Sequence, residues 1–401
     1  NPFEELELLV NKFRVKENSI LSPLTGGAVG YFGYDLARFL EKLPSKSIDD
    51  LKLPDAYFMF IDTVILFDHW ENKKYILSVT KPSKDLKESE KAAQNSLALL
   101  EKQIRIREKR KTNRKIDTRY NCEIRMSPMI SKKEYIEMIK RVKEYIRAGD
   151  VYEVNLSHRL EGKLENEPWE IYKKINSFNP APFSAYMKFG DLKIISSSPE
   201  RFLKVKGTAA ESRPIKGTRP RGKTLKEDEA LRNELLLSEK EKAENLMIVD
   251  LVRNDLGRVC KFGSVEVAEL MTIEPYSRVF QMVSTIRGEL CGDKNTFDCI
   301  KACFPGGSMT GAPKIRAMEI IDELEPVRRG IYSGSLGYLS FSGEIDLNII
   351  IRTIIASKGK MYLQAGGAIV ADSDPKAEYE ETWHKAMSVL GGIEGKVSYK
   401  L

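Results

Sequence analysis

Apolar residues follow two spacings along this chain, and each spacing predicts a different kind of element. Alternating or continuous apolar runs predict strands, whereas recurrence every three or four residues predicts helices. Ser131 and Glu134 form the pattern of a capping box, which predicts a helix from there to Ile146. The other predicted elements are strands at 151–164, 183–190, 192–198, 334–341, 347–357 and 360–370 and helices at 225–256, 310–322 and 375–390.

The first hundred residues predict strands as well. Two apolar runs, 57–69 and 73–80, are separated by a polar turn and predict a strand pair, and 83–104 favours a helix. The glycine-rich stretch 26–43 predicts a turn before an amphipathic segment, and its glycine spacing is not that of a dinucleotide-binding loop. Strands outnumber helices and occur in hairpin-like pairs. This favours an α+β fold with mainly antiparallel sheets over a doubly wound parallel sheet.

The length of 401 residues suits one large layered unit or two domains. We expect residues 1–115 to be a β-rich N-terminal part ending in a basic linker, and 116–401 to be a second region. Because the first residue is Asn1, we expect further residues upstream. No apolar run reaches the roughly 18 residues of a membrane span, so no membrane partner is expected.

Charge and cysteine content narrow the partners and the compartment. The net charge is +7, and the basic run 105–115 has no interleaved aromatic residues. This pattern favours a solvated linker over a nucleic-acid-binding surface. Five cysteines without a CxxC pair indicate reduced thiols and a cytoplasmic protein. With three histidines in the chain, catalysis is expected to depend on Glu, Lys and Arg.

Two predicted helices each carry a pair of glutamates on one face. Glu241 and Glu244 share a face with Ile248 and Leu251, so their carboxylates are expected to point inward. An unpaired buried charge is costly, and a hard cation such as Mg²⁺ would offset it. The alternative is a helix start enriched in glutamate because of the helix dipole.

The C-terminal helix repeats this pattern with Glu378, Glu381 and Lys385 on one face. The alternative there is a surface ion pair between Glu381 and Lys385, worth about 0.3–0.5 kcal/mol. Two helices with paired glutamates favour a shared Mg²⁺ site.

Two further segments suit the binding of an anion. The glycines of "AGGAI", Gly366 and Gly367, would allow backbone N–H groups to approach a carboxylate. Arg352 interrupts a strand of leucines and isoleucines, and its guanidinium suits a bidentate carboxylate. The alternative for Arg352 is an arginine that reaches solvent at a strand end.

Lys216 lies in the stretch "SRPIKGTRPRG", among Arg213, Arg219, Arg221 and Lys223. Repulsion between like charges favours the neutral amine, which predicts a lowered pKa for Lys216. The residue is either a surface lysine in a basic turn or a nucleophile held against an anionic substrate.

These segments together resemble the chorismate-utilising enzymes, which include anthranilate, aminodeoxychorismate, isochorismate and salicylate synthases. The resemblance implies a large α/β sandwich of two stacked antiparallel sheets with helices outside, and it makes 116–401 the chorismate-binding catalytic region. The matching stretches are "GDVYEVNLS", "SSSPERFL", "PIKGTRPRG", "EKAENLMIVDLVRNDLGRV", "PGGSMTGAPK", "YSGSLGY", "IIIRT", "QAGGAIVADS" and "EYEETWHKA".

The resemblance also implies roles for individual residues. It implies Mg²⁺ held by Glu244 and Glu381, with Glu241 and Glu378 close by, clamping the carboxylate on the chorismate ring. Glu200 is implied as the general acid that helps hydroxide leave from C4. The implied contacts to substrate are Thr218 at the ring and Tyr332, Arg352, Gly366, Gly367 and Lys385 at the carboxylates.

The lysine of "PIKGT" resembles the form of the motif in aminodeoxychorismate synthases, whereas anthranilate synthases usually carry "PIAGT". The resemblance implies that the amine of Lys216 attacks C2 of chorismate, after which ammonia attacks C4 and expels the lysine. The alternatives are an anthranilate synthase large subunit and, from a different class, a non-catalytic chorismate-binding subunit.

Two positions depart from the pattern of the family, and one activity is missing. Gln281 stands where pyruvate-eliminating members usually have histidine, and Glu153 stands where glutamine or lysine is usual. Glutamine cannot shuttle a proton near neutral pH, which favours a non-aromatic, aminated product. The chain contains no recognisable glutaminase, so we expect ammonia from a glutamine amidotransferase subunit in a heterodimer, or from free ammonium.

Overall fold

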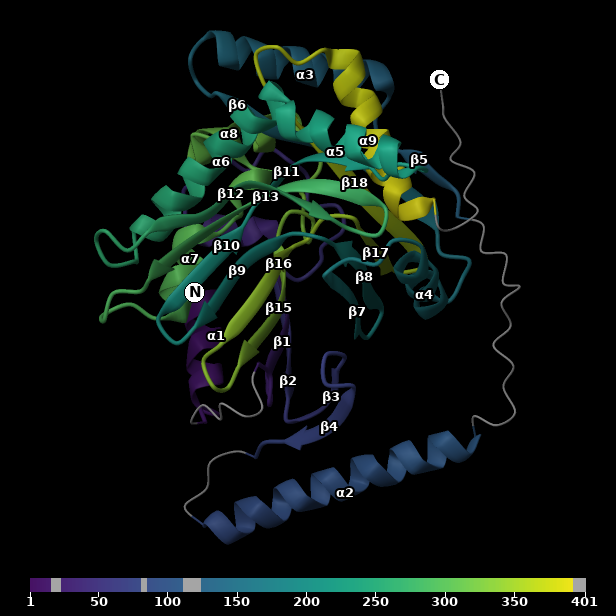
Figure 1. Ribbon diagram of the computed structural model, residues 1–401, viewed down its shortest axis with the longest axis vertical. Coiled ribbons are helices and arrows are strands. Elements are labelled where there is room, and N and C mark those ends of the chain that lie inside the picture. The colour runs from purple at the N-terminus through teal and green to yellow at the C-terminus, as the bar shows by residue number, and fades with distance from the viewer. Residues whose placement is uncertain (16–22, 81–84, 111–123, 392–401) are drawn as a thin grey trace.

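The computed structural model describes residues 1–15, 23–80, 85–110 and 124–391. Most of the strands form two large sheets, and every pairing between named strands is antiparallel. The chain therefore has the mixed, antiparallel architecture that the strand pattern predicts, with helices outside the sheets (Figure 1). No helix within these ranges is long and apolar enough to cross a membrane.

The first sheet has nine strands and receives both N-terminal and central segments. In spatial order its strands are β11 (Ile215–Pro220), β13 (Val279–Glu289), β10 (Ala209–Arg213), β9 (Arg201–Lys206), β16 (Ile345–Ile349), β15 (Ser335–Ser340), β1 (Gly27–Phe32) and β2 (Ala56–Ile61), with β12 (Glu266–Pro275) also paired to β13.

The second sheet has seven strands, and a separate hairpin pairs β3 (Thr63–Asp68) with β4 (Lys73–Ser78). In spatial order the strands of the second sheet are β14 (Gly311–Ala312), β6 (Glu153–Lys163), β18 (Lys360–Ile369), β17 (Thr353–Ser357), β8 (Leu192–Ser198) and β7 (Phe183–Phe189), with β5 (Met126–Pro128) paired to β6.

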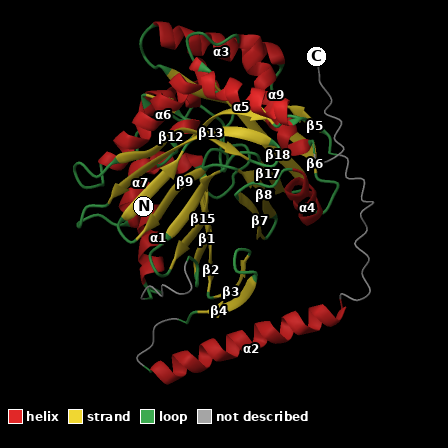
Figure 2. Cartoon of the chain, viewed as in Figure 1, coloured by secondary structure: helices red, strands yellow, loops and turns green. Residues whose placement is uncertain are grey.

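Figure 2 shows α3, α5, α6 and α9 gathered over the sheets, whereas α2 lies beside the β3–β4 hairpin at the opposite end. The helices are α1 (Pro2–Asn11), α2 (Leu86–Arg110), α3 (Lys132–Arg147), α4 (Pro168–Phe178), α5 (Leu225–Leu237), α6 (Glu239–Gly257), α7 (Thr296–Cys303), α8 (Lys314–Leu324) and α9 (Pro375–Leu390), with short 3₁₀ helices η1 (Tyr34–Phe39) and η3 (Gly307–Met309).

Three apolar clusters hold these layers together. One packs α1, α6 and α7 on the nine-stranded sheet, and another packs α3, α4, α8 and α9 on the seven-stranded sheet. The third joins the two sheets directly, because it contains Tyr31 and Leu336 of the first sheet together with Ile194 and Ile355 of the second, and Ile350 between them. The sheets are thus in apolar contact at one end.

Several predicted elements are confirmed with small shifts. The capping box at Ser131 and Glu134 is present, and the C-terminal helix has the predicted bounds, 375–390. The helix predicted at 310–322 begins at Lys314, because the preceding residues form η3 and β14. The helix predicted at 83–104 runs to Arg110, so the first half of the basic run is helical, and residues 105–108 are exposed. The rest of that run lies outside the described residues.

Other predictions were wrong in ways that affect the site. The helix predicted at 225–256 is two helices, because Ser238 leaves the helical conformation and caps α6 through Glu241 N. The strand predicted at 347–357 is two strands in different sheets. The run 57–69 likewise breaks into β2 and β3. The glycine-rich stretch forms strand β1, in which a Cβ on Gly30 would lie 1.9 Å from the Tyr57 carbonyl oxygen.

Candidate active site

A cavity of about 790 Å³ opens where α6 and α9 meet strands of both sheets. Its size is in the range of small-molecule sites. Gly367 and Glu378 lie just behind the wall, because a Cβ on Gly367 would be 3.3 Å from Glu378 Oε2. All the other predicted site residues line the cavity: Glu200, Lys216, Thr218, Glu241, Glu244, Tyr332, Arg352, Gly366, Glu381 and Lys385.

Lys216 reaches the cavity from strand β11 and is buried. Its Nζ donates a hydrogen bond of 2.8 Å to Glu153 Oε1 and lies 3.9 Å from Glu244 Oε2. Burial opposes the charged amine, but Glu153, Glu244 and Glu200 outweigh it and raise the pKa of Lys216 above its ordinary value. The resting lysine is therefore an ammonium ion within a group of carboxylates.

The prediction of a lowered pKa for Lys216 was wrong because carboxylates neutralise the neighbouring basic side chains and surround Lys216 itself. Arg213 pairs with Glu274, Arg221 with Asp228, and Arg219 with Glu234 and, at 3.3 Å, with Glu241. Arg219 lines the same cavity as Lys216. The alternative of a surface lysine is also excluded, since only 8% of Lys216 is exposed.

Gly217 gives β11 the shape that brings these groups together. It has φ of +84°, and the pairing of β11 with β13 shifts register between Ile215 and Thr218. A Cβ on Gly217 would lie 2.9 Å from Glu241 Oε2. Only glycine adopts this conformation without strain and leaves room for that carboxylate.

Glu200 follows β8 and is buried beside Lys216. It accepts a hydrogen bond of 2.6 Å from Ser308 Oγ. Burial raises the pKa of Glu200 to about 7, against the opposing influence of Ser308, Ile215 N–H, Lys216 and Arg352. A carboxyl group with this pKa can hold a proton near neutral pH and give it to a leaving group.

Arg352 supplies a positive charge to the cavity wall. It lies between β16 and β17 with φ of +50°, where the chain crosses from one sheet to the other. It lines the cavity, which differs from the alternative of an arginine that reaches solvent at a strand end. Within the described ranges no carboxylate forms an ion pair with it. Its guanidinium is available to a carboxylate of a ligand.

The four predicted metal-site glutamates come from α6 and α9. Glu244 is buried, and burial raises its pKa to about 7. The nearby Lys216 acts to lower this pKa, and Glu153 acts to raise it. Glu378 accepts a hydrogen bond of 2.8 Å from Ser373 Oγ, and Glu381 pairs with Lys385 at 2.7 Å. The Glu381–Lys385 pair of the alternative is therefore present, but both residues line the cavity.

A comparison with known protein families identifies the family of the chain. Residues 2–391 match the family described as chorismate binding enzyme. The chain belongs to the chorismate binding enzyme family. The residues of the cavity are therefore those of a chorismate-utilising enzyme.

Relatives within this family carry two names. Anthranilate synthase component 1 of Acetivibrio thermocellus is 45% identical over 397 residues, covering 98% of this chain and 80% of the relative. Aminodeoxychorismate synthase component 1 of Bacillus subtilis is 42% identical over 394 residues, covering 98% and 82%. The structure of anthranilate synthase component I from Streptococcus pneumoniae has a TM-score of 0.86 and 33% identity, covering 97% of this chain and 85% of that chain.

The glutamates of the cavity have some of the features of a divalent-cation site. Among the described residues, no three His, Cys, Asp or Glu side chains lie close enough together to hold a metal ion. However, Glu244 Oε1 is buried and accepts no hydrogen bond from any of them. Glu378 and Glu381 both approach Gly367, whose Cβ would lie 3.3 and 3.9 Å from their oxygens. A buried carboxylate oxygen without a hydrogen-bond donor, in the same site as two more carboxylates, fits a hard cation.

Sequence reasoning missed three residues that complete the site. Ser308 had no role in the sequence analysis, and its Oγ donates a hydrogen bond to Glu200. Lys240 had no role there either, and its Nζ lies 3.3 Å from Glu378 Oε1. Glu153 had no assigned role, and it is fully buried against Lys216. No pattern in the sequence reveals these pairings, which join distant segments.

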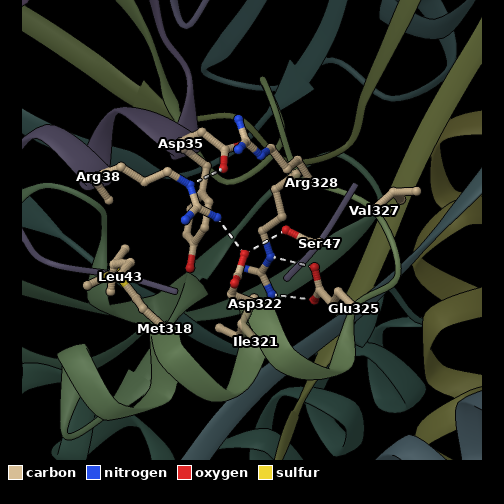
Figure 3. A pocket seen from close by; sticks show the side chains of 13 residues that line it. Asp35, Arg38, Leu43, Ser47, Met318, Ile321, Asp322, Glu325, Val327 and Arg328 are labelled. Carbon is tan, nitrogen blue, oxygen red and sulfur yellow. Dashed lines mark hydrogen bonds and ion pairs between the residues drawn. The ribbon is translucent and has the colours of Figure 1, made fainter. Parts of the chain in front are cut away.

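A second, much smaller pocket lies between η1 and α8 (Figure 3). Its space of about 10 Å³ is at the limit of what one water molecule needs. The carboxylates on the α8 side are already paired, because Asp322 binds both Arg38 and Ser47 Oγ, the latter at 2.6 Å, and Glu325 pairs with Arg329 at 2.7 Å. These contacts hold the N-terminal segment against α8.

Proposed function

We propose that the chain is an aminodeoxychorismate synthase component 1, which converts chorismate and ammonia to 4-amino-4-deoxychorismate on the route to 4-aminobenzoate. The observation that carries this proposal is the position of Lys216. Its amine is buried in the cavity wall beside Glu200, which has a pKa of about 7, and beneath the glutamates of α6 and α9. A nucleophile and an acid thus face the same space.

Lys216 must lose a proton before its amine can attack. Glu153 Oε1, at 2.8 Å, is the carboxylate that accepts its hydrogen bond and is placed to take that proton. The free amine forms a bond to C2 of chorismate, both ring double bonds shift (C1=C2 to C1=C6 and C5=C6 to C4=C5), and the C4–O bond breaks. Glu200 supplies the proton with which the hydroxyl group leaves as water.

Ammonia then forms a bond to C4, both double bonds shift back, and the C2–N bond to Lys216 breaks. The overall exchange replaces the C4 hydroxyl of chorismate by an amino group and releases water. Mg²⁺ held by Glu244 and Glu381, with Glu241 and Glu378 nearby, would bind the ring carboxylate of chorismate and neutralise its charge. Arg352, Tyr332, Lys385 and the backbone at Gly366 and Gly367 would hold the carboxylates, with Thr218 beside the ring.

The source of ammonia is the second part of the proposal. The relatives are named as component 1 of their enzymes. We therefore propose a glutamine amidotransferase partner that forms a heterodimer with this chain, and free ammonium as the substitute when the partner is missing.

Anthranilate synthase component 1 is the second candidate, because relatives of that name are as similar to the chain as the aminodeoxychorismate synthases are. Incubation with chorismate, Mg²⁺ and ammonium separates the two. We expect an aminated, non-aromatic product that retains the enolpyruvyl group, identified by mass spectrometry. Fluorescent anthranilate with release of pyruvate would overturn the assignment in favour of the second candidate.

A further inference from the structure

Lys240 forms ion pairs with two of the proposed metal ligands at once. Its Nζ lies 3.3 Å from Glu378 Oε1 on α9 and 3.9 Å from Glu244 Oε1 on its own helix α6. Glu244 Oε1 is the buried oxygen that accepts no hydrogen bond from the described residues. The ammonium group of Lys240 thus bridges the same carboxylates that a divalent cation would use.

The other two lysines of this cluster are held by additional partners. Lys216 is buried and hydrogen-bonded to Glu153, and Lys385 donates to the Gly366 carbonyl oxygen at 3.0 Å as well as pairing with Glu381. Lys240, by contrast, has 54% of its side chain exposed at the start of α6. The described residues form no backbone hydrogen bond with its head group, which can therefore move into solvent by breaking only its two ion pairs.

We infer that Lys240 is a resident counter-ion of the metal site, which a divalent cation displaces when it binds. The inference rests on the Mg²⁺ site of the proposed function and adds a competing residue to it. A cation held by Glu244 close to Glu378 would lie beside the ammonium group of Lys240, and like charges repel. Binding of the metal is therefore an exchange, in which protonated Lys240 leaves for solvent.

The exchange predicts that removing the charge of Lys240 tightens metal binding. A half-exposed ion pair changes a binding constant by a factor of about five at most. Lys240 forms two such pairs, and both compete with the metal. We expect Lys240→Met to bind Mg²⁺ roughly three- to tenfold more tightly than the wild type. Lys242→Met is the matched control, because Lys242 lies on the same helix and pairs with the exposed Glu239.

The test is isothermal titration calorimetry of the EDTA-treated full chain with MgCl₂ and no chorismate. Tighter binding in Lys240→Met, with wild-type affinity in Lys242→Met, supports the exchange. Wild-type or weaker affinity in Lys240→Met, when the wild type binds Mg²⁺, overturns this inference and leaves the proposed function standing. If neither the wild type nor either variant binds Mg²⁺, the metal site and this inference are both wrong. Product analysis with chorismate then tests the proposed amination separately.

A second readout uses the wild-type protein and does not depend on a variant that folds. If Mg²⁺ releases Lys240 to solvent, its rate of acetylation by a small amine-reactive ester should rise with Mg²⁺ concentration. Peptide mass spectrometry would follow this, with Lys242 as the internal reference. Equal acetylation of Lys240 with and without Mg²⁺, at concentrations where calorimetry shows binding, would contradict displacement.

Discussion

Gly217 offers a sharp test of how the backbone of β11 shapes the site. We expect Gly217→Ala to destabilise the protein for two separate reasons. The left-handed conformation at φ +84° costs a residue with a Cβ about 1–2 kcal/mol. The new methyl group would also lie 2.8 Å from Leu235 Cδ1 and 2.9 Å from Glu241 Oε2, and such overpacking costs about 1–3 kcal/mol.

The two costs together give an expected loss of about 2–5 kcal/mol in the free energy of unfolding. Gly207→Ala is the matched control, because Gly207 also has a positive φ, +59°, but a Cβ there meets nothing within 4 Å. We expect that variant to lose about 1–2 kcal/mol from the backbone alone. It should keep its activity, since Gly207 lies in the β9–β10 turn away from the cavity.

Urea unfolding followed by circular dichroism measures both losses, and turnover of chorismate measures the effect on the site. Gly217→Ala should lose activity as well as stability, because the methyl group displaces Glu241 and the strand that carries Lys216. If the two alanine variants unfold at the same urea concentration, the contact at Glu241 is not as tight as the geometry indicates. Full activity in Gly217→Ala would refute the reasoning for the site.

Three further predictions concern the chemistry. Lys216→Ala should lose the covalent adduct that intact-protein mass spectrometry detects without ammonium, together with most amination, and wild-type turnover would remove Lys216 from the mechanism. The pKa of Glu200 is raised to about 7, so its proton is present below that pH and lost above it; kcat/KM should therefore fall on the alkaline side with a midpoint near 7. Glu200→Gln should be about 10²–10⁴-fold slower across the profile, and an unchanged alkaline limb in that variant would assign the titration elsewhere. Glu244→Gln should abolish the heat of Mg²⁺ binding, and retained binding would exclude Glu244 as a ligand.

Local patterns were enough to predict most of the helices and strands and to single out the glutamate pairs and Arg352, whereas only the resemblance to the family implied Glu200, Thr218 and Tyr332. Helix α9 was predicted to the residue because Asp374 caps it, a proline begins it, and its apolar face is regular. The glutamate pairs were found because an inward-facing carboxylate on an apolar helix face is costly and therefore informative. These inferences need only neighbours within a few positions of the chain.

The sequence could not reveal what depends on contacts between distant segments. Lys216 meets Glu153 across 63 positions of the chain, and that one contact reverses the predicted direction of its pKa shift. The run 347–357 is apolar on both sides of Arg352, and the sequence offers an anion-binding role for that arginine without showing that the chain changes sheets there. Likewise, the sequence does not show that the neighbouring strands approach β1 so closely that its positions require glycine.

At Arg352 the chain leaves one sheet and enters the other, and Ile350, two positions earlier, belongs to the cluster that joins them. A substrate carboxylate bound at Arg352 would therefore contact the point at which the two layers meet. If substrate and a second molecule both favour the same fit between the layers, each raises the affinity of the chain for the other by the same factor. This architecture thus offers a short route for control from a distance, because the anchor of the substrate and the joint between the layers are almost the same piece of chain.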